Sequence, residues 1–423
     1  MSLKGICSVH QDEPLVGAVN NKIKLTTIYR YVFAALLITL SLSGCNTPSQ
    51  KASLEGDDRT PAGAGYIGQG EYTGTYWPTR QWRKCKPEAV GMSSEKLLEA
   101  IEYAATPAFN TDGLAVVRKG HIVGEAYWGN IRIDSKHVSH SMAKSFTSSL
   151  VGIAIDKRQI EGLDVKICTY YDEWDCDDED DFRSRITLRH AMTLTTGLEW
   201  KEDWTIWDPN TNDALKMGAS GHFVKYMAQR NGLYEPGRRF VYSTGDPMLL
   251  SKVIQDATGM TAFEYARQNL FKPLNIAGVN WDEDADGYTS TAWGLYATVR
   301  DYAKFGYLYL NKGRWEDRII VSEAWVNKST RTDPSVKMWA AYGYLWHVNL
   351  PYRLKWNRSA VSPDAIPPDG YMAEGVMGQS IVIIPSKDLV IVRVAKETSG
   401  GHMDLVKFLT MILEAIMPSA EEK

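Results

Sequence analysis

The sequence predicts an α/β fold in which an antiparallel sheet is flanked by helices and carries a mostly helical inserted lobe. Alternating apolar runs separated by short turns occur early and late in the chain, as in antiparallel strands. Residues 165–285 instead combine helical segments with loops. The 423 residues are 44% hydrophobic, which is enough for one large domain or two interleaved ones with a substantial core.

The first predicted sheet element is a hairpin, in which 114–117 and 121–127 are joined by a turn at Lys119-Gly120. A small-residue helix follows Ser141, and 301–310 forms another helix. Strands are predicted at 342–350, 380–385 and 389–395, and an apolar stripe at helical spacing predicts a closing helix over 402–417. The α/β lobe therefore comprises about 81–165 and 286–420, and the helical lobe about 166–285.

The first 45 residues predict export. A positive stretch with Lys22, Lys24 and Arg30 precedes an apolar run over 31–42, which is too short for a lasting membrane span. The run ends in Leu42-Ser43-Gly44-Cys45, which resembles a bacterial lipobox. Cys45 would then be lipidated and become the mature N-terminus, and residues 46–80 would form a flexible tether. A plain signal peptide or a core helix is the alternative interpretation.

Asn46 follows the lipobox cysteine, and in the lipoproteins that this segment resembles that residue favours the outer membrane. We therefore expect a lipid-anchored protein that faces the periplasm. The net charge of −4 and the lack of a basic run argue against a nucleic-acid partner. Oligomeric state is left open by the sequence.

The remaining cysteines are consistent with export. Cys168 and Cys176 bracket a short acidic, aromatic segment and are a candidate disulfide, although the sequence leaves open whether they pair. Cys85 would then be free. The acidic run Asp175 and 177–181 lacks the spacing of a calcium loop, and no paired histidines occur at metal-ligand spacing. We expect no metal and no cofactor.

Two segments point to chemistry. Ser141-Met142-Ala143-Lys144 places a hydroxyl and an amine one helical turn apart, and Tyr242-Ser243-Thr244 follows about a hundred residues later. A partly neutral lysine can take the serine proton, and a tyrosine can relay it. The spacing alone is weak evidence, because Ser93-Ser94-Glu95-Lys96 has it too. Ser93 precedes a helix-forming run and is interpreted as an N-cap, which is also the alternative for Ser141.

The context of Ser141 resembles the nucleophile motif of the serine β-lactamase-like superfamily. Three further segments match that superfamily in order, namely 186–198, the approach to the tyrosine over 235–243, and the site-lining edge strand over 375–379 and 381–385. The resemblance spans about 85–415 and is strongest to class C β-lactamase-related esterases and 6-aminohexanoate-dimer hydrolases. Four ordered motifs are far more specific than any one of them.

The resemblance implies acyl transfer through Ser141, with Lys144 and Tyr242 as proton-transfer groups, either of which could be the immediate base. It also implies an oxyanion site formed by the backbone N–H groups of Ser141 and Val376. Two positions depart from the family. Ala373-Glu374-Gly375 stands where β-lactamases have Lys-Thr-Gly, which argues against efficient β-lactamase activity, and Thr244 replaces the more usual asparagine or serine.

We therefore expect a serine hydrolase that acts on small-molecule esters or linear amides. The substrate-binding candidates are Thr244, Glu374, Gly375, Trp207 and Trp346, with Trp200, Trp204 and Trp293 as further aromatics near the site by resemblance. Glu374 is a candidate contact for a substrate amine. A catalytically idle penicillin-binding-like lipoprotein and a D-amino-acid peptidase are the alternatives.

Overall fold

The computed structural model describes residues 66–203, 208, 210–336, 341–355, 357, 359–396 and 402–418. All of them belong to one compact unit, Asp57–Lys423. The lipidation candidate Cys45, the leader and most of the predicted tether lie outside the described residues, as do Trp204 and Trp207. No helix in the described part of the chain is long and apolar enough to cross a bilayer.

The main sheet has five antiparallel strands in the order β2-β1-β10-β9-β8. The strands are β1 (Thr111–Arg118), β2 (His121–Tyr127), β8 (Tyr371–Gly375), β9 (Gln379–Ile384) and β10 (Leu389–Ala395). The predicted hairpin is confirmed, because Lys119 and Gly120 both have positive φ, as a tight two-residue turn requires. The strands expected at 380–385 and 389–395 are confirmed as well. Strand β8 forms one edge of the sheet, so the edge strand predicted over 375–379 and 381–385 is wrong: 376–378 is a 3-10 turn and β9 lies one strand further in.

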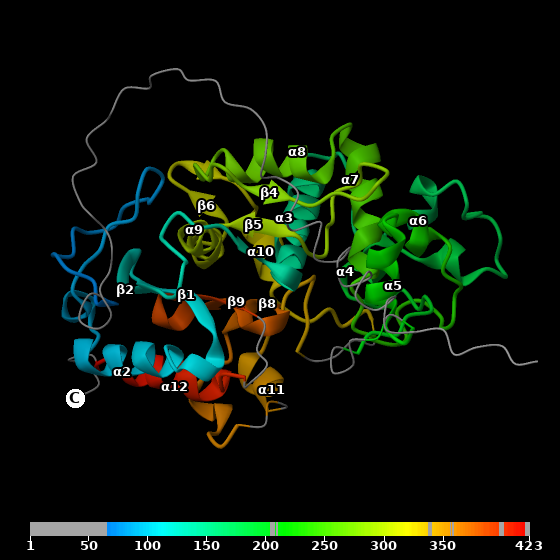
Figure 1. Cartoon of the computed structure of the whole chain (residues 1–423). Helices are drawn as coiled ribbons and strands as arrows, with labels where there is room; N and C mark the ends of the chain where they lie inside the picture. Colours follow the sequence, from blue (N-terminus) through cyan, green and yellow to red (C-terminus); the bar gives the residue numbers. More distant parts are fainter. Residues whose placement is uncertain are drawn as a thin grey trace, which may run out of the picture. The chain divides into compact units, whose positions relative to one another are not determined.

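Helices cover both faces of this sheet (Figure 1). Helices α2 (Ser94–Ala104) and α12 (Leu405–Glu414) share one core with one face. Helices α3 (Ala143–Asp156) and α9 (Val299–Leu310) share a second, larger core with the other face. Ser93 caps α2 by accepting a hydrogen bond from the Lys96 amide, as predicted.

Shorter elements lie between β2 and β8 in sequence. The helices are α4 (Leu188–Met192), α5 (Asp213–Ser220), α6 (Phe223–Ala228), α7 (Leu249–Thr258), α8 (Ala262–Ala266), α10 (Glu323–Ser329) and α11 (Leu350–Leu354). The strands are β3 (His137–Val138), β4 (Asn280–Trp281) and β5 (Leu295–Ala297), which form a three-stranded sheet, and β6 (Arg314–Trp315) with β7 (Arg318–Ile319). The sequence reading missed both small sheets, because strands of two or three residues carry no periodic pattern.

Helix α3 is buried along nearly its whole length, from Ala143 to Ala154. Several of its small polar residues have hydroxyls that are hydrogen-bonded inside the core, although Ser148 Oγ has no hydrogen-bond partner. Ser145 donates to the Leu345 carbonyl at 2.7 Å and Thr147 to the Thr291 carbonyl at 2.7 Å. A Cβ on Gly152 would lie 2.4 Å from the Trp325 ring, so glycine is needed there for close packing. These contacts fix the helix that carries Lys144.

Two expected elements differ in the structure. The strand predicted at 342–350 is wrong, because the chain folds back on itself at Leu345, where φ is +61°, and Gly343 N donates to Trp346 O. Backbone pairing in this segment is limited to isolated bridges, from His347 to Tyr342 and to Met372 of β8, and nearly all of its side chains are buried. The closing helix begins at Leu405 rather than 402, because Asp404 caps it through the Lys407 amide.

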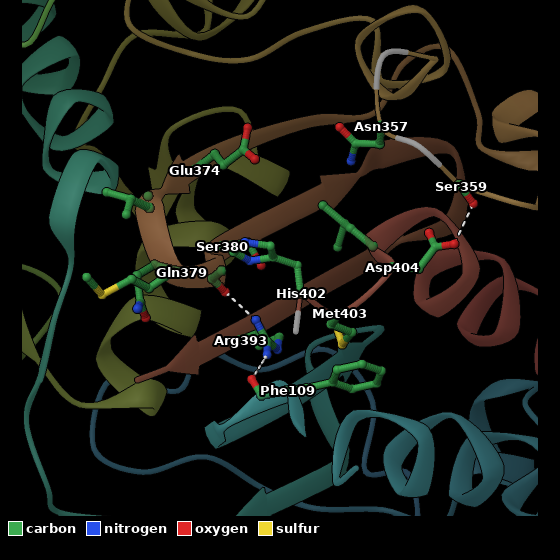
Figure 2. Close-up of a pocket in the computed structure, with 15 residues that line it drawn as sticks. Phe109, Asn357, Ser359, Glu374, Gln379, Ser380, Arg393, His402, Met403 and Asp404 are labelled. Carbon is green, nitrogen blue, oxygen red and sulfur yellow. Dashed lines mark hydrogen bonds between the residues drawn. The ribbon is translucent and has the colours of Figure 1, made fainter. Parts of the chain in front are cut away.

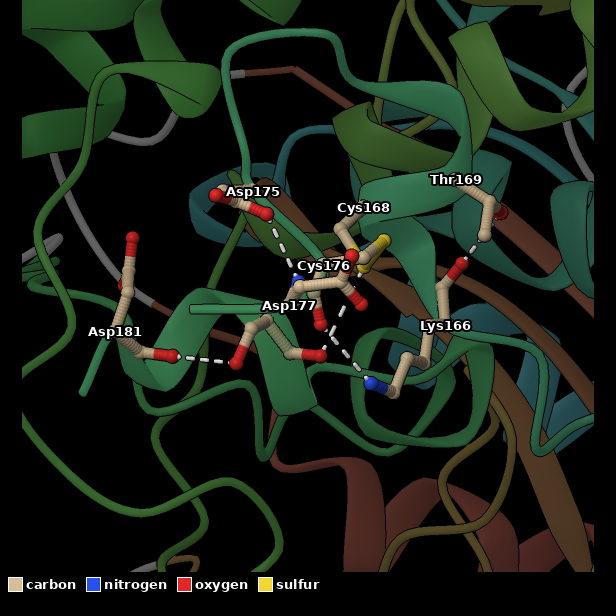
Figure 3. The surroundings of a disulfide bond; sticks show 8 residues. Lys166, Cys168, Thr169, Asp175, Cys176, Asp177 and Asp181 are labelled. Carbon is tan, nitrogen blue, oxygen red and sulfur yellow. Dashed lines mark hydrogen bonds between the residues drawn. A yellow bond between two sulfur atoms is a disulfide. The ribbon is translucent and has the colours of Figure 1, made fainter. Parts of the chain in front are cut away.

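Cys168 and Cys176 form a disulfide, which closes the loop drawn in Figure 3. In the same loop, the Lys166 ammonium donates to the Cys176 carbonyl at 3.2 Å, and Asp175 accepts from the Asp177 amide at 2.9 Å. Cys85 is a buried free thiol. Among the described residues, no group of three or more His, Cys, Asp or Glu is arranged to hold a metal ion.

Candidate active site

Ser141 lies in the 3-10 turn His140–Met142, which leads directly into α3. The turn is anchored to β5, because Ser139 N donates to Leu295 O at 2.7 Å and Leu295 N donates to Ser139 Oγ at 3.2 Å. His140 adopts a left-handed conformation with φ of +45°, which is uncommon for a residue with a Cβ. The half-buried Ser141 hydroxyl is therefore held at the start of a long buried helix.

Lys144 is 1% exposed and its ammonium has three acceptors. Nζ lies 2.9 Å from Ser141 Oγ, 3.3 Å from Thr244 Oγ1 and 3.4 Å from the Ala292 carbonyl oxygen. Burial lowers the Lys144 pKa to about 8, although the Glu202 charge opposes that shift. With that pKa, about one lysine in ten is neutral at pH 7. The arrangement can therefore deprotonate Ser141.

Tyr242 reaches Ser141 from the segment before α7. The backbone there is fixed by hydrogen bonds from Val241 N to Leu194 O and from Gly237 N to Thr195 O. The Tyr242 side chain hydrogen bonds with Ser141, and its ring centroid lies 5.2 Å from Lys144 Nζ. Burial and the Glu202 charge raise the Tyr242 pKa well above its usual value. The phenol therefore stays protonated and is suited to pass a proton on.

Thr244 is buried and faces Lys144 rather than open space. Its hydroxyl donates to Glu202 Oε1 at 2.6 Å, and its backbone N–H donates to Glu202 Oε2 at 2.7 Å. Trp200 Nε1 donates to the same Oε2 at 2.9 Å. Sequence reasoning did not identify Glu202, because a glutamate 42 residues before Thr244 has no spacing signal.

The end of β8 packs directly against the nucleophile turn. A Cβ on Gly375 would lie 2.5 Å from the Ser139 carbonyl oxygen and 3.1 Å from His140 Cβ, so no larger residue fits there without displacement. Val376, the predicted second oxyanion donor, is the next residue. Gly375 therefore holds the edge strand close to Ser141, which is a different role from the substrate contact that we predicted for it.

Glu374 on β8 is half-buried and pairs with Arg353 of α11. Arg353 Nη2 donates to Glu374 Oε2 at 2.8 Å, and His347 Nε2 lies 3.5 Å from the same oxygen. Burial works against ionisation of Glu374, but Arg353 and His347 hold its pKa below its usual value. Burial lowers the His347 pKa to about 4, so this imidazole is neutral at pH 7. A substrate amine at Glu374 would have to share the carboxylate with Arg353.

The aromatic substrate-binding candidates differ in how far they are exposed to solvent. The prediction for Trp346 is wrong, because its side chain is 0% exposed and packs among Phe305, Tyr309 and Tyr371. Trp293 is half-buried and contacts the Phe223 ring. Trp207 lies outside the described residues. Large aromatics in a hydrophobic core give the same sequence pattern as those in a pocket.

A cavity of about 470 Å³ lies beside the edge strand, between residues 374–380 and the start of α12 (Figure 2). Arg393, one of its lining residues, already donates to the carbonyls of Gly378 and Phe109 and to the Thr111 hydroxyl. Glu374 and Val376 also line the cavity, whereas Ser141, Lys144 and Tyr242 do not.

Comparison with known proteins places this geometry in a family. The model of the family described as Beta-lactamase matches residues 101–413. The chain belongs to the Beta-lactamase family. The fold, with its antiparallel sheet and flanking helices, is the β-lactamase/transpeptidase-like fold that the sequence predicts.

Similar proteins carry several names. A 6-aminohexanoate-dimer hydrolase of Paenarthrobacter ureafaciens is 22% identical over 51% of this chain and 55% of its own length. An Escherichia coli K12 protein, provisionally named a D-alanyl-D-alanine carboxypeptidase, is 21% identical over 79% of this chain and 90% of its own.

Solved structures share the fold. A Bacillus anthracis protein, provisionally named a 6-aminohexanoate-dimer hydrolase, has a TM-score of 0.60 at 18% identity and covers 74% of this chain and 82% of its own. A penicillin-binding protein homologue from Pyrococcus abyssi, an octamer, has a TM-score of 0.54 at 17% identity over 78% of each chain. At these identities the structures show the fold alone.

Proposed function

We propose that this Beta-lactamase family protein is a serine hydrolase that cleaves carboxylic esters or linear amides through an acyl-enzyme on Ser141. The observation that carries the proposal is the 2.9 Å contact between Ser141 Oγ and the buried Lys144, whose pKa of about 8 makes it a usable base. The raised pKa of Tyr242 favours Lys144 over Tyr242 as the immediate base.

In the acylation step, neutral Lys144 takes the Ser141 proton as Oγ attacks the substrate carbonyl. The resulting oxyanion accepts hydrogen bonds from the backbone N–H groups of Ser141 and Val376, each typically worth about 3–4 kcal/mol in the transition state. As the C–O or C–N bond breaks, Tyr242 gives its proton to the leaving group and regains one from the Lys144 ammonium. Water then attacks the acyl-enzyme by the reverse proton path, which restores Ser141.

The substrate class follows from the edge strand. Ala373 stands where β-lactamases have the lysine that holds a β-lactam carboxylate, and the neighbouring Glu374 is already paired with Arg353, so linear substrates are favoured over β-lactams. The relationship to a 6-aminohexanoate-dimer hydrolase supports linear amides. If Glu374 binds a substrate amine, Glu374→Gln lowers kcat/KM for cationic substrates more than for neutral ones, and unchanged selectivity would exclude that contact.

The test is labelling with a fluorophosphonate probe, followed by peptide mapping. We expect labelling of Ser141 in the wild type and none in Ser141→Ala. Ser93→Ala is the matched control, because it removes the serine of the other Ser-x-x-Lys motif, which only caps α2. No labelling of the folded wild type would contradict the proposal and favour an idle binding protein.

A D-amino-acid peptidase is the second candidate, because the Escherichia coli relative provisionally named a carboxypeptidase covers 79% of this chain. Hydrolysis of D-alanyl-D-alanine peptides but not their L-isomers would establish it. Equal or absent hydrolysis of both would exclude it.

We also propose that the protein is exported and lipid-anchored through Cys45, in the outer membrane facing the periplasm, on the strength of the lipobox-like segment and Asn46. The full chain should incorporate a palmitate analogue in bacteria, and Cys45→Ala should not. Incorporation that survives the substitution would contradict the anchor. Sucrose-gradient separation of the membranes tests the location.

A further inference from the structure

Thr244 connects the buried lysine to a carboxylate that the mechanism above does not use. Its Oγ1 lies 3.3 Å from Lys144 Nζ and donates to Glu202 Oε1 at 2.6 Å. A threonine hydroxyl has one hydrogen and two lone pairs. Since Glu202 takes that hydrogen, Thr244 can only accept a hydrogen bond from Lys144.

The same count applies to the neutral amine of Lys144, which has two hydrogens and one lone pair. Its neighbours are Thr244 Oγ1, the Ala292 carbonyl and Ser141 Oγ. The Ala292 carbonyl can only accept, and Glu202 makes Thr244 an acceptor too. Both amine hydrogens are therefore used, and the lone pair is left for the Ser141 proton, as a general base requires.

We propose that Glu202 is a positioning residue that acts through Thr244 to aim the Lys144 lone pair at Ser141. The inference rests on the proposed function of Ser141 and Lys144. It also gives a role to Thr244, which stands where the family has asparagine or serine. The carboxylate of Glu202 accepts the hydroxyl hydrogen of Thr244 and so fixes the orientation of that hydroxyl.

A carboxylate is needed because both Glu202 oxygens accept. Oε2 takes the Thr244 backbone N–H at 2.7 Å and the Trp200 indole N–H at 2.9 Å, neither of which can reverse. In Glu202→Gln the amide oxygen would be held by those two donors, so Nε2 would face Thr244 Oγ1. The Thr244 hydrogen would then turn to the Lys144 lone pair and compete with Ser141.

The other titratable groups around this network also bear on its pH response. Glu202 raises the pKa values of Lys144, Tyr242 and the buried Asp246, the last of which burial raises to about 7. The Lys144 charge lowers the pKa values of His140 and His347, both of which burial brings to about 4. Glu374 also raises the Tyr242 pKa, and Arg353 lowers it.

The test measures the rate of fluorophosphonate labelling of Ser141 against pH in the full chain. We expect Glu202→Gln to lower the high-pH plateau at least tenfold and to move the rise in rate to lower pH, because Lys144 loses a neighbouring negative charge. Glu199→Gln is the matched control, since it makes the same change on an exposed side chain three residues away. It should label like the wild type.

Thr244→Val separates positioning from general damage. It should lower the plateau, and adding Glu202→Gln should lower it no further, because Glu202 acts through the missing hydroxyl. The inference would be overturned if Glu202→Gln kept the wild-type plateau. It would also be overturned if Glu202→Gln lowered the plateau by the same factor in the Thr244→Val background as in the wild type. In either case, labelling of Ser141 in the wild type would leave the proposed function intact. If Glu202→Gln does not fold, a wild-type plateau in Thr244→Val overturns the inference instead. Absence of wild-type labelling would end both proposals.

Discussion

Replacing Lys144 with methionine should abolish acylation and yet stabilise the protein. The side chain is 1% exposed, and burial lowers its pKa from 10.5 to about 8. A cation that is harder to protonate in the native state than in the unfolded state weakens folding. Methionine has a similar length and no charge, so the variant Lys144→Met removes that cost along with the base.

The magnitude follows from the two pKa values. Their difference corresponds to about 3 kcal/mol of destabilisation below pH 8, where both states are protonated. Between pH 8 and 10.5 the unfolded state binds the proton more tightly than the native state, so wild-type stability rises with pH and the penalty disappears. Losing the hydrogen bonds to Ser141, Thr244 and Ala292 offsets about 1–2 kcal/mol. The net gain in Lys144→Met is about 1–2 kcal/mol at pH 7 and close to zero at pH 9.5.

Urea unfolding followed by tryptophan fluorescence, at pH 7 and pH 9.5, measures both values in wild type and variant. Fluorophosphonate labelling of the same samples measures the activity. A variant that is less stable than the wild type at pH 7, or whose gain does not shrink at pH 9.5, would refute the buried, destabilised lysine. Labelling that persists in Lys144→Met would refute its role as the base.

Three further predictions follow from the geometry. The rate of Ser141 labelling should rise about tenfold per pH unit up to about pH 8 and then level off, because only neutral Lys144 is a base; a flat rate between pH 6 and 8 would contradict this. Gly375→Ala should reduce labelling at least tenfold and lower the melting temperature only slightly, because its Cβ would lie 2.5 Å from the Ser139 carbonyl oxygen and push the edge strand away from the turn that carries Ser141. Gly218→Ala is the control, because a Cβ there would meet nothing within 4 Å. Equal labelling of both variants would refute the argument. The double variant Cys168→Ser/Cys176→Ser should lose about 2–3 kcal/mol of stability, because the disulfide joins residues 8 apart and limits the conformational freedom of the unfolded chain. A reductant should lower the stability of the wild type and leave that of the variant unchanged. A wild type whose stability does not respond to the reductant would argue against the disulfide.

The elements that sequence predicts well are those set by neighbours in the chain. The hairpin at Lys119-Gly120 follows from a two-residue turn, and the helix predicted over 301–310 is confirmed as α9, although Thr298 caps it so that it begins at Val299. Ser141 and Lys144 are three residues apart at the start of a helix, so their contact is local as well. Tyr242 was identified by resemblance to the family, because it lies about a hundred residues after Ser141 in the chain.

The sequence by itself therefore determined the fold class, the Ser141-x-x-Lys144 motif and strands β1, β2, β9 and β10, but not the edge strand β8. Tertiary structure decided which groups surround that motif: Glu202 behind Thr244, Arg353 against Glu374, and the burial of Trp346. It also decided that 342–350 is a folded-back loop, because its backbone bonds to Met192 and Ser329 are made across the core. A pKa or a hydrogen-bond direction depends on groups brought close by packing, and a chain has no local signal for a partner that lies tens of residues away.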